Sequence, residues 1–254
     1  MNPDSLNDGV FIVLGASGGI GQQVARRLNA AGRRVLLASR KSHHLSELAA
    51  ELGAPCCELD ATNLEDVEAC FSRANSEIGP ICGVVNCVGS VLLKPAHLTT
   101  ADEWNTTIAT NLTSAFATVR AAANNMTDGG GSVVLISSAA ARIGLASHEA
   151  IAAAKAGVVG LAQAAAASYA SRGLRFNVVS PGLVKTKLTQ KIWGSSRAAA
   201  VSTSMHPLGR LGEPDEVAAL IEWLLDPANS WVTGEVFSID GGLGNVRLNQ
   251  RHAT

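Results

Sequence analysis

Short apolar runs alternate with longer segments of helical period along almost the whole chain. Runs that are apolar on both faces are typical of strands in a parallel sheet that helices cover on both sides. The expected strands are residues 10–14, 34–38, 56–59, 81–86, 132–137, 175–179 and 235–239. The expected helices are residues 19–31, 42–52, 64–77, 101–126, 151–171 and 213–225. The alternation predicts an α/β protein with a doubly wound, seven-stranded parallel sheet and helices on both faces.

Nothing in the sequence divides the chain, so residues 1–254 are expected to form one domain. We find no Pro/Gly/Ser linker, charge block or repeat between two halves. The least regular stretch is residues 185–212, where a Trp, a His and a Pro stand among small polar residues. Its length predicts a mobile flap over a pocket.

Composition and charge narrow the classes of function. The 254 residues are 47% hydrophobic and 16% charged, with 25 glycines, which is typical of a tightly turned globular core. The formal net charge of −1 offers little attraction for nucleic acid or an anionic membrane. The longest uncharged run, residues 9–25, is too short and too interrupted to span a bilayer. The amino terminus shows neither a basic nor an apolar leader, so the expected location is the cytoplasm.

The cysteines do not indicate a metal site. Their number is odd, and no pair has the spacing of zinc ligands beside histidines. We expect reduced, structural thiols and no bound metal. The five are Cys56, Cys57, Cys70, Cys82 and Cys87.

A glycine-rich turn follows the first strand and opens the first helix. Residues 15–21 read Gly-Ala-Ser-Gly-Gly-Ile-Gly. Glycines let the backbone approach a pyrophosphate, and a helix N-terminus offers free N–H groups and a positive dipole to phosphate. The turn predicts a dinucleotide site in a Rossmann fold. The residues expected around the phosphates are Gly15, Ser17, Gly18, Gly19, Ile20 and Gly21.

The residues after the second strand bear on the choice of nucleotide. A dehydrogenase selective for NAD usually carries an acid there, which hydrogen-bonds the ribose 2′-hydroxyl. Here Ser39 takes that place, and Arg40 and Lys41 follow. A guanidinium can bind a 2′-phosphate through two parallel hydrogen bonds. NADP(H) is therefore the expected cofactor, and NAD(H) is the less favoured alternative.

Further motifs follow in a fixed order. They are Asp60 after the third strand, Asn-Cys-Val-Gly at 86–89, Asn111 in Asn-Leu-Thr-Ser-Ala-Phe, Ile-Ser-Ser at 136–138, Lys155, Asn-Val-Val-Ser-Pro-Gly-Leu-Val-Lys-Thr at 177–186, Pro-Leu-Gly-Arg-Leu-Gly-Glu-Pro at 207–214 and Asp-Gly-Gly at 240–242. From about residue 10 to 242 the chain resembles the short-chain dehydrogenase/reductase family, in particular members similar to the 3-oxoacyl-[acyl-carrier-protein] reductases.

The resemblance implies NAD(P)-dependent hydride transfer to or from a carbonyl or alcohol. It implies that Ser138 holds the substrate oxygen and that Asn111 steadies a water of a proton relay. Lys155 would bond the ribose and lower the pKa of a neighbouring acid. The cofactor residues that it implies besides the glycine-rich turn are Asp60 and Ala61 at the adenine, Asn86, Val88 and Gly89 after the fourth strand, and Pro181, Gly182, Val184 and Thr186 beside the nicotinamide.

The chain departs from the family at that neighbouring acid. The family has a tyrosine four residues before the lysine, and here the position is Ile151. The only tyrosine of the chain, Tyr169, lies about 21 Å beyond Lys155 along the same helix and is expected to pack there. Negative charge builds on the substrate oxygen as hydride reaches the carbon, and Ile151 cannot donate a proton. Losing a general acid costs about 10²- to 10⁴-fold in rate.

Other side chains could supply the proton. His148 stands one helical turn before the vacant position, in the loop that enters the helix, and histidine suits proton transfer near neutral pH. Glu149 is adjacent, although an acid there also suits a helix N-terminus. Lys94 and His206 could meet the substrate, and Lys155 could act on it directly. A surface or structural role remains open for each.

The expected association is a homotetramer or homodimer. Family members of this kind assemble through the helices after the fourth and fifth strands, and small side chains let two helices approach closely. Packing of the same helix on its own sheet is the alternative explanation. The small residues that form the expected face are Gly157, Gly160, Ala164 and Ala167.

Three functions remain open from the sequence. The leading one is an NADP(H)-dependent oxidoreductase with an atypical proton donor. The others are a nucleotide-binding pseudoenzyme that acts as a partner subunit, and non-redox chemistry on the same scaffold. The substrate is expected to be a mainly apolar small molecule. The residues expected to line its pocket are Ser90, Leu92, Leu145, Leu183 and Trp193.

Overall fold

The computed structural model describes residues 9–40, 42–126 and 129–247. In these residues seven parallel strands form one sheet in the order β3-β2-β1-β4-β5-β6-β7. The expected doubly wound sheet is therefore confirmed, and every expected strand end lies within two residues of the observed one. The strands are β1 (Val10–Leu14), β2 (Arg34–Ser39), β3 (Cys56–Glu58), β4 (Ile81–Asn86), β5 (Gly131–Ile136), β6 (Leu174–Pro181) and β7 (Val236–Ile239).

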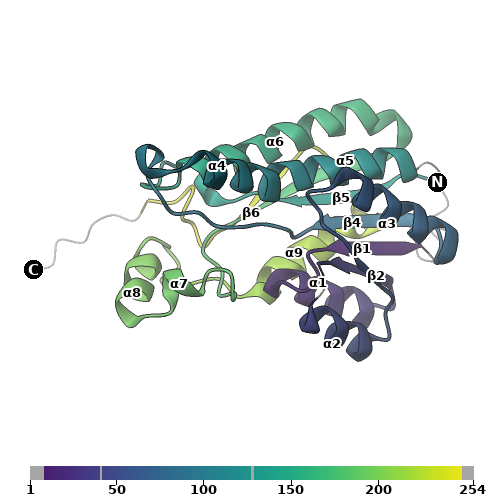
Figure 1. Ribbon diagram of the computed structural model, residues 1–254, viewed down its shortest axis with the longest axis horizontal. Helices are drawn as coiled ribbons and strands as arrows, with labels where there is room; N and C mark the ends of the chain where they lie inside the picture. The colour runs from purple at the N-terminus through teal and green to yellow at the C-terminus, as the bar shows by residue number, and fades with distance from the viewer. Residues whose placement is uncertain (1–8, 41, 127–128, 248–254) are drawn as a thin grey trace, which may run out of the picture.

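Helices connect the strands and cover the sheet on both faces (Figure 1). Each crossover returns the chain to the same end of the sheet, which is why all strands run parallel. The helices are α1 (Gly19–Ala30), α2 (His43–Leu52), α3 (Leu64–Glu77), α4 (Ala101–Ile108), α5 (Ser114–Asn125), α6 (Glu149–Tyr169), α7 (Gln190–Trp193), α8 (Ser196–Ser204) and α9 (Pro214–Leu225).

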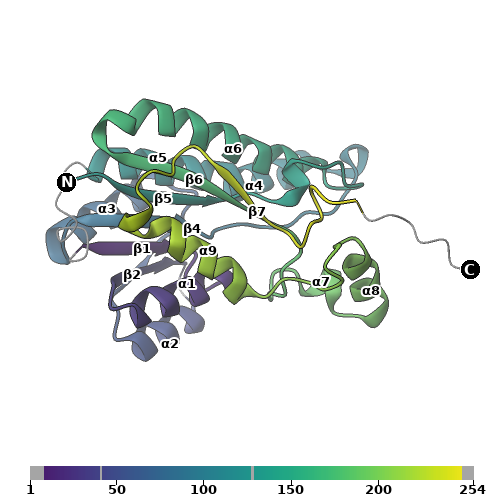
Figure 2. The same ribbon diagram turned by 180° about the vertical axis from the view of Figure 1, so that it is seen from behind.

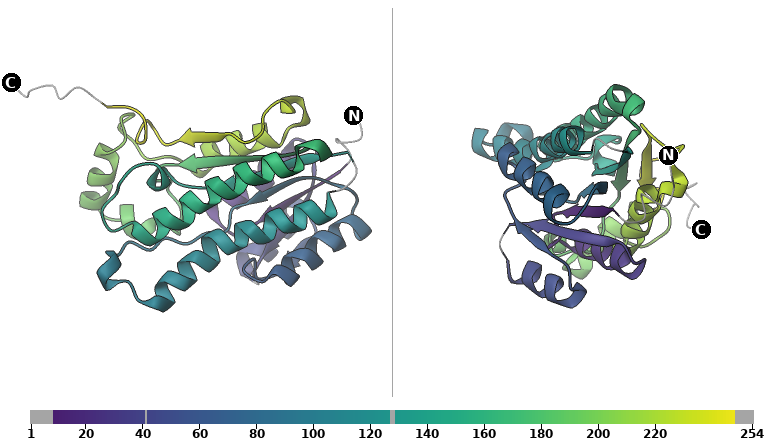
Figure 3. Two further views of the ribbon diagram at one scale, coloured as in Figure 1. Left: turned by 90° about the horizontal axis from the view of Figure 1, so that it is seen from above. Right: turned by 90° about the vertical axis from the view of Figure 1, so that its right-hand side faces the viewer.

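The sheet separates two apolar cores (Figures 2 and 3). Successive strand residues point to opposite faces, so Ile12 packs towards α3, α5 and α6, whereas Val13 packs towards α1, α2 and α9. Both side chains are fully buried. This two-sided burial explains why the strands appear in the sequence as uninterrupted apolar runs.

The expected single helix over residues 101–126 is interrupted. A π-helical turn, Ala109–Thr113, joins α4 to α5. The Asn111 side chain donates from Nδ2 to the carbonyl oxygen of Thr107, 2.9 Å away. That oxygen is the one that the Asn111 backbone N–H would reach in a regular α-helix, so the side chain replaces a helical bond and the turn widens.

Residues 185–212, the least regular stretch of the sequence, contain two short helices, α7 and α8, which the sequence analysis did not predict. The Ser195 hydroxyl accepts a hydrogen bond from the N–H of Ala198 and so begins α8. Both helices lie beyond the carboxyl ends of the strands, away from the sheet (Figures 1 and 2). The mobility of this segment, which we call the flap, stays a prediction.

One described stretch, Glu149–Arg172, is long and apolar enough to cross a membrane by length and composition. It comprises α6 and the short turn that follows. Val158, Ala162 and Ala166 of this helix belong to the core beneath the sheet. The apolar composition of α6 therefore serves packing within the domain.

Packing between β1 and β4 requires a glycine at position 83. A Cβ at Gly83 would lie 2.4 Å from the Phe11 ring and 3.3 Å from a methyl of Leu225. We expect Gly83→Ala to lower the free energy of unfolding by about 1–3 kcal/mol, because the buried ring must shift. Urea denaturation measures this. Gly144→Ala is the control, since a Cβ at Gly144 meets nothing within 4 Å, and equal stabilities of the two variants would contradict the prediction.

Candidate active site

A cleft opens at the carboxyl ends of β1 and β4. The strand order reverses beside β1, so the chain leaves β1 and β4 in opposite directions and a crevice remains between the two turns. The cleft has a volume of about 740 Å³, within the range of small-molecule sites. Its wall contains thirteen of the residues expected to bind a cofactor, namely Gly15, Ser17, Gly18, Gly19, Ile20, Gly21, Ser39, Arg40, Asp60, Ala61, Val88, Gly89 and Thr186.

The glycine-rich turn fits a pyrophosphate. Gly15 has a φ of +76°, and a Cβ there would lie 2.8 Å from the backbone of Cys87 and Val88. A Cβ at Gly21 would lie 2.3 Å from the carbonyl oxygen of Gly15. Within the described residues no side chain caps the N-terminus of α1 at Gly18, so its N–H groups face the cleft unoccupied by protein acceptors. Such an N-terminus binds phosphate oxygens well.

The adenosine end of the cleft is polar. The hydroxyls of Ser17 and Ser39 lie 2.7 Å apart and tie the glycine-rich turn to the end of β2. Arg40 is exposed on the same wall. Asp60 accepts hydrogen bonds from the N–H and hydroxyl of Thr62, and these bonds, with help from the Arg40 charge, lower the pKa of the Asp60 carboxyl. Lys41, also expected here, lies outside the described residues.

Asn111 and Lys155 are buried behind Gly89, which lines the cleft, and neither of the two lines the cleft or the smaller pocket itself. A Cβ at Gly89 would lie 3.1 Å from Oδ1 of Asn111 and 3.6 Å from Nζ of Lys155. The Asn111 amide is already engaged: Oδ1 accepts from the N–H of Ser90, and Nδ2 donates to the Ser90 hydroxyl and to Thr107. One lone pair of Oδ1 is the only hydrogen-bonding capacity that this side chain has left.

Lys155 is held in an apolar environment. It is 6% exposed, and its Nζ donates to the carbonyl oxygen of Ile136, 2.8 Å away. Burial disfavours the ammonium form and lowers the pKa of Lys155 to about 8. The Lys155 amine is therefore charged at neutral pH, and it loses its charge when the pH rises past about 8.

A second, smaller pocket adjoins the flap. It encloses about 190 Å³. Ser138 lies on its wall at the end of β5, and Ile151 lies on the wall from α6 and is 5% exposed. Most other lining side chains are apolar, and they include Leu145, Leu183 and Met205. Pro181 and Gly182, expected beside the nicotinamide, also line this pocket.

His148 reaches this pocket with one ring nitrogen to spare. Its Nδ1 lies 2.7 Å from the carbonyl oxygen of Ala146, and since a carbonyl only accepts, Nδ1 carries the hydrogen. Nε2 is then the nitrogen that can gain or lose a proton. The preceding residue, Ser147, has a φ of +62°, a conformation that non-glycine residues rarely adopt. That backbone is held by the Ser147 carbonyl, which accepts from the N–H of Lys94.

The other candidate proton donors are engaged elsewhere or face away. Nζ of Lys94 forms an ion pair with Glu103, at 2.8 Å and 2.9 Å from its two oxygens. Glu149 is exposed in the first turn of α6 and is not among the residues that line the pocket. His206 lines the pocket, yet both of its ring nitrogens are hydrogen-bonded to protein.

Several expected site residues lie behind the walls. The Asn86 amide donates to Thr118 and accepts from the N–H of Val88, so it holds the turn after β4 from inside. Val184 is buried beside Gly212, below the flap. Among the expected pocket residues, Trp193 instead bonds Thr189, and Ser90 lines the nucleotide cleft. Leu92 lines neither the nucleotide cleft nor the smaller pocket in the described part of the chain.

Sequence reasoning missed four threonines that line the cleft or the smaller pocket. They share no motif, because they lie in different elements. One lies in a loop, one in the flap, one in α4 and one in the π-helical turn. A polar residue two positions after an aspartate is a weak signal for an Asx turn, and it could have pointed to the first of them. The four are Thr62, Thr106 and Thr110 in the nucleotide cleft and Thr189 in the smaller pocket.

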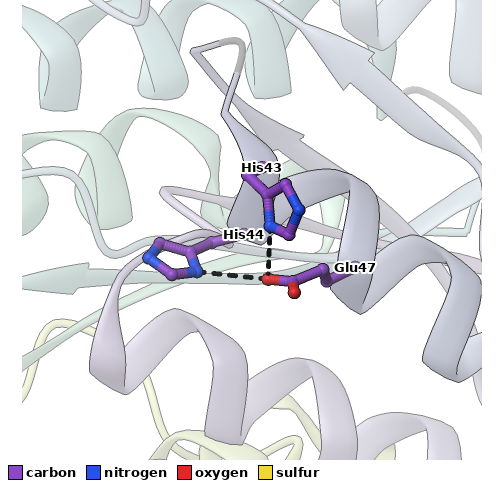
Figure 4. A group of neighbouring side chains, drawn as sticks. All are labelled: His43, His44 and Glu47. Atoms are coloured by element: carbon purple, nitrogen blue, oxygen red, sulfur yellow. Dashed lines mark hydrogen bonds and ion pairs between the residues drawn. The ribbon is translucent and has the colours of Figure 1, made fainter.

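An exposed cluster at the start of α2 lies outside both walls (Figure 4). Nδ1 of His43 and Nδ1 of His44 lie 2.9 Å and 3.3 Å from one oxygen of Glu47. Hydrogen bonds from His43 and then His44 lower the pKa of the Glu47 carboxyl. Of the described residues, these three form the only group with metal-ligand spacing.

A glycine-rich turn at the switch point of a doubly wound sheet is typical of dinucleotide-binding α/β proteins. The family model described as Enoyl-(Acyl carrier protein) reductase matches residues 15–244. The chain is 34% identical over 245 residues to a D-threitol dehydrogenase of Mycolicibacterium smegmatis, covering 93% of each chain. It is 33% identical to the 3-oxoacyl-[acyl-carrier-protein] reductase FabG of Vibrio harveyi, covering 94% of this chain and 98% of that protein.

A solved structure agrees with these matches. The fold has a TM-score of 0.91 with a short-chain type dehydrogenase/reductase from Mycobacterium ulcerans, which is 32% identical and covers 96% of this chain and 92% of its own. The chain therefore belongs to the short-chain dehydrogenase/reductase family. These relatives are named dehydrogenases and reductases, which supports an oxidoreductase with a nicotinamide cofactor.

The burial of Lys155 gives stability a specific pH dependence. Its pKa is about 8 in the folded protein, against an ordinary value of 10.5. The unfolded chain therefore binds more protons between these two values, and stability rises with pH there. The difference corresponds to about 3 kcal/mol. We therefore compare the free energy of unfolding of Lys155→Met with that of wild type. We expect the variant minus wild-type difference, which we call the lead of the variant, to be largest at about pH 7.5 and to fall by about 2–3 kcal/mol towards about pH 10.5.

Denaturation of both proteins across this range measures the lead. The thiol that interacts with Lys155 is Cys87, and burial raises its pKa to about 12, so in both folded proteins it stays protonated over most of this range. Groups that do not interact with Lys155 titrate alike in the two proteins, so the subtraction isolates Lys155. A lead that does not change with pH would contradict the assigned burial of the ammonium.

Proposed function

We propose that this protein is an NADP(H)-dependent oxidoreductase that transfers hydride to or from the carbonyl or alcohol carbon of a small, mainly apolar substrate, with His148 as its proton donor. One observation carries the proposal: His148 lines the same small pocket as Ser138 and Ile151, and its Nε2 forms no hydrogen bond with the described residues. That arrangement provides a proton donor and a hydroxyl where the phenol is missing.

The proposed preference for NADP(H) depends on the adenosine end of the cleft. Ser39 bears no charge that would repel a 2′-phosphate, and it is tied to Ser17. Arg40 stands exposed on the wall and forms no hydrogen bond with the described residues. Its five donors are therefore available to an anion. Asp60 and Thr62, which line the same end of the cleft, would face the adenine.

The residues of the chain would divide the chemistry as follows. The bound nicotinamide supplies or accepts the hydride. Ser138 donates a hydrogen bond to the substrate oxygen, and protonated His148 donates the proton from Nε2 during reduction. Lys155, a buried cation, orients the ribose and adds positive potential beside the reacting oxygen. Asn111 keeps the turn at Ser90 in place through two hydrogen bonds.

The polar contacts around the substrate are few, so the rest of the pocket selects by shape. Leu145, Leu183 and Met205 surround a space of about 190 Å³. That volume is smaller than a drug-sized site and suits a compact apolar group around the reacting carbon. Ile151 adds to this apolar wall.

We further propose assembly as a homodimer or homotetramer through α5 and α6. Gly160, Ala164 and Ala167 form an exposed small-residue face on α6, and Phe116 of the neighbouring helix α5 is 47% exposed. Gly157 does not belong to this face, because a Cβ there would meet Leu112 of the same chain at 2.8 Å. Small and aromatic side chains together suit close helix packing.

A nucleotide-binding pseudoenzyme is the second candidate, and Ile151 favours it. The site would bind NADPH as proposed, but without turnover. Non-redox chemistry on the same scaffold would instead give product without a change in nicotinamide absorbance. Measured turnover of NADPH therefore separates both alternatives from the leading proposal.

Substitution of His148 tests the proton donor. We expect wild type to oxidise NADPH with some carbonyl compounds of a broad panel, within about tenfold of the rate of Ile151→Tyr, which restores the phenol. His148→Ala should lose about 10²- to 10⁴-fold in kcat, the usual contribution of a general acid. Absorbance at the nicotinamide band measures each rate. Glu149→Ala is the control, because that neighbouring carboxylate is exposed and does not line the pocket.

Two results would overturn the proposal. A wild-type rate in His148→Ala would exclude His148 as the donor. A wild type that binds NADPH but turns over at least about 10³-fold more slowly than Ile151→Tyr would favour the pseudoenzyme or, if product forms without absorbance change, non-redox chemistry.

Substitution of Arg40 tests recognition of the 2′-phosphate. We expect Arg40→Ala to raise the Kd of NADPH about 10- to 100-fold, because it removes a charge-assisted bidentate contact, and to leave the Kd of NADH within about twofold. Quenching of tryptophan fluorescence measures both constants. Arg142→Ala is the control, since that exposed arginine bonds Ser238 and Asn245 and does not line the nucleotide cleft. An equal loss for both nucleotides would contradict a role in recognising the phosphate.

A further inference from the structure

His206 is a buried residue of the flap whose position is fixed on both sides. It is 4% exposed and lies just beyond the end of α8. Its Nδ1 lies 2.7 Å from the carbonyl oxygen of Ser202, in the last turn of α8. A carbonyl can only accept, so Nδ1 carries the hydrogen, and the Ser202 oxygen accepts it together with the N–H of Met205 at the end of α8.

The other ring nitrogen faces the end of β6. The N–H of Leu183 donates to Nε2 of His206 at 3.1 Å. Nε2 accepts this bond only in the neutral tautomer that the Ser202 contact already selects. The two bonds therefore support each other, and they join the flap to the turn formed by Pro181, Gly182 and Leu183.

The surroundings keep the ring against this turn. A Cβ at Gly182 would lie 2.7 Å from Nε2 of His206, so the ring occupies the space that a side chain would need. Gly241 lies on another side of the His206 side chain. A Cβ built at Gly241 would be 3.5 Å from Cβ of His206, which is ordinary van der Waals contact. The N–H of Leu208 bonds the carbonyl of Gly241, which secures the segment just beyond the histidine.

We propose that His206 is a positioning residue: it clamps the flap to the turn of residues 181–183 and so holds that turn ready for the nicotinamide half of the nucleotide. The inference rests on the proposed nucleotide site, because it needs the turn to face the nicotinamide. It assigns His206 no contact with the substrate and no proton transfer. The sequence suggested His206 as a proton donor, and its two bonds instead fix a loop.

Two substitutions separate the two bonds. In His206→Asn the side-chain amide stands near the place of Nδ1, so it can donate to Ser202 but cannot reach Leu183. In His206→Gln the longer side chain brings Oε1 near the place of Nε2, where it can accept from Leu183. The two variants therefore differ mainly in the bond to the turn, and the clamp predicts opposite results for them.

The readout is binding of two probes by tryptophan fluorescence. NADPH carries the nicotinamide, whereas adenosine 2′,5′-bisphosphate has the adenine and the 2′-phosphate but no nicotinamide. We expect His206→Asn to raise the Kd of NADPH about tenfold and to leave that of the bisphosphate within about twofold, because only the nicotinamide half uses the turn. His206→Gln should bind both probes within about threefold of wild type.

Three results would overturn the clamp. His206→Asn could bind NADPH as wild type does, it could lose both probes equally, or His206→Gln could be as impaired as His206→Asn. Hydrogen exchange of wild type gives a test that needs no variant: the Leu183 amide must exchange more slowly than an exposed amide before nucleotide is added. If wild type binds neither probe, the proposed function fails, and exchange at Leu183 still decides whether the clamp exists.

Discussion

The close approach of two turns, one after β1 and one after β4, is the constraint on which the rest of the site depends. The N–H of Cys87 donates to the carbonyl oxygen of Leu14. A side chain at Gly15 would collide with the backbone of Cys87 and Val88. With this contact in place, α1 starts with its N–H groups pointing into the crevice. Gly21 lets the first turn of α1 sit on Gly15. Any bulkier residue at these two glycines would separate the walls of the nucleotide cleft.

Two asparagines connect this contact to the helical layer. Asn86 fixes the turn after β4 to Thr118 of α5, and Asn111 fixes Ser90 to the π-helical turn. Each amide spends most of its hydrogen bonds inside the protein. The presence of Asn111 is therefore explained by architecture alone, and it is no evidence of turnover. The evidence for chemistry has to come from groups with unused capacity, which are His148, Ser138 and Arg40.

The strands were predictable because strands buried on both faces appear in the sequence as continuous apolar runs. Features set by single side-chain bonds were not. The π-helical turn depends on Asn111 reaching the Thr107 carbonyl, and α8 depends on the Ser195 cap, neither of which periodicity reports. In the site, the glycine-rich turn was predictable because its geometry admits few residues. The engagement of both His206 nitrogens was not, because Leu183 approaches the ring only in three dimensions.

On the proposed chemistry, Ile151 stands where the family resemblance predicts a tyrosine, and the proton therefore reaches the substrate by another route. A buried phenol needs a chain of groups to recover its proton, and Lys155 and a water would form that chain. Ile151 cannot take part in such a chain, and Nζ of Lys155 donates to the carbonyl oxygen of Ile136. On the proposed chemistry His148 needs no such chain, because it lines the pocket and is only half-buried, within reach of solvent. Lys155 would then act only through its charge. The proton would come from His148 rather than from a buried phenol.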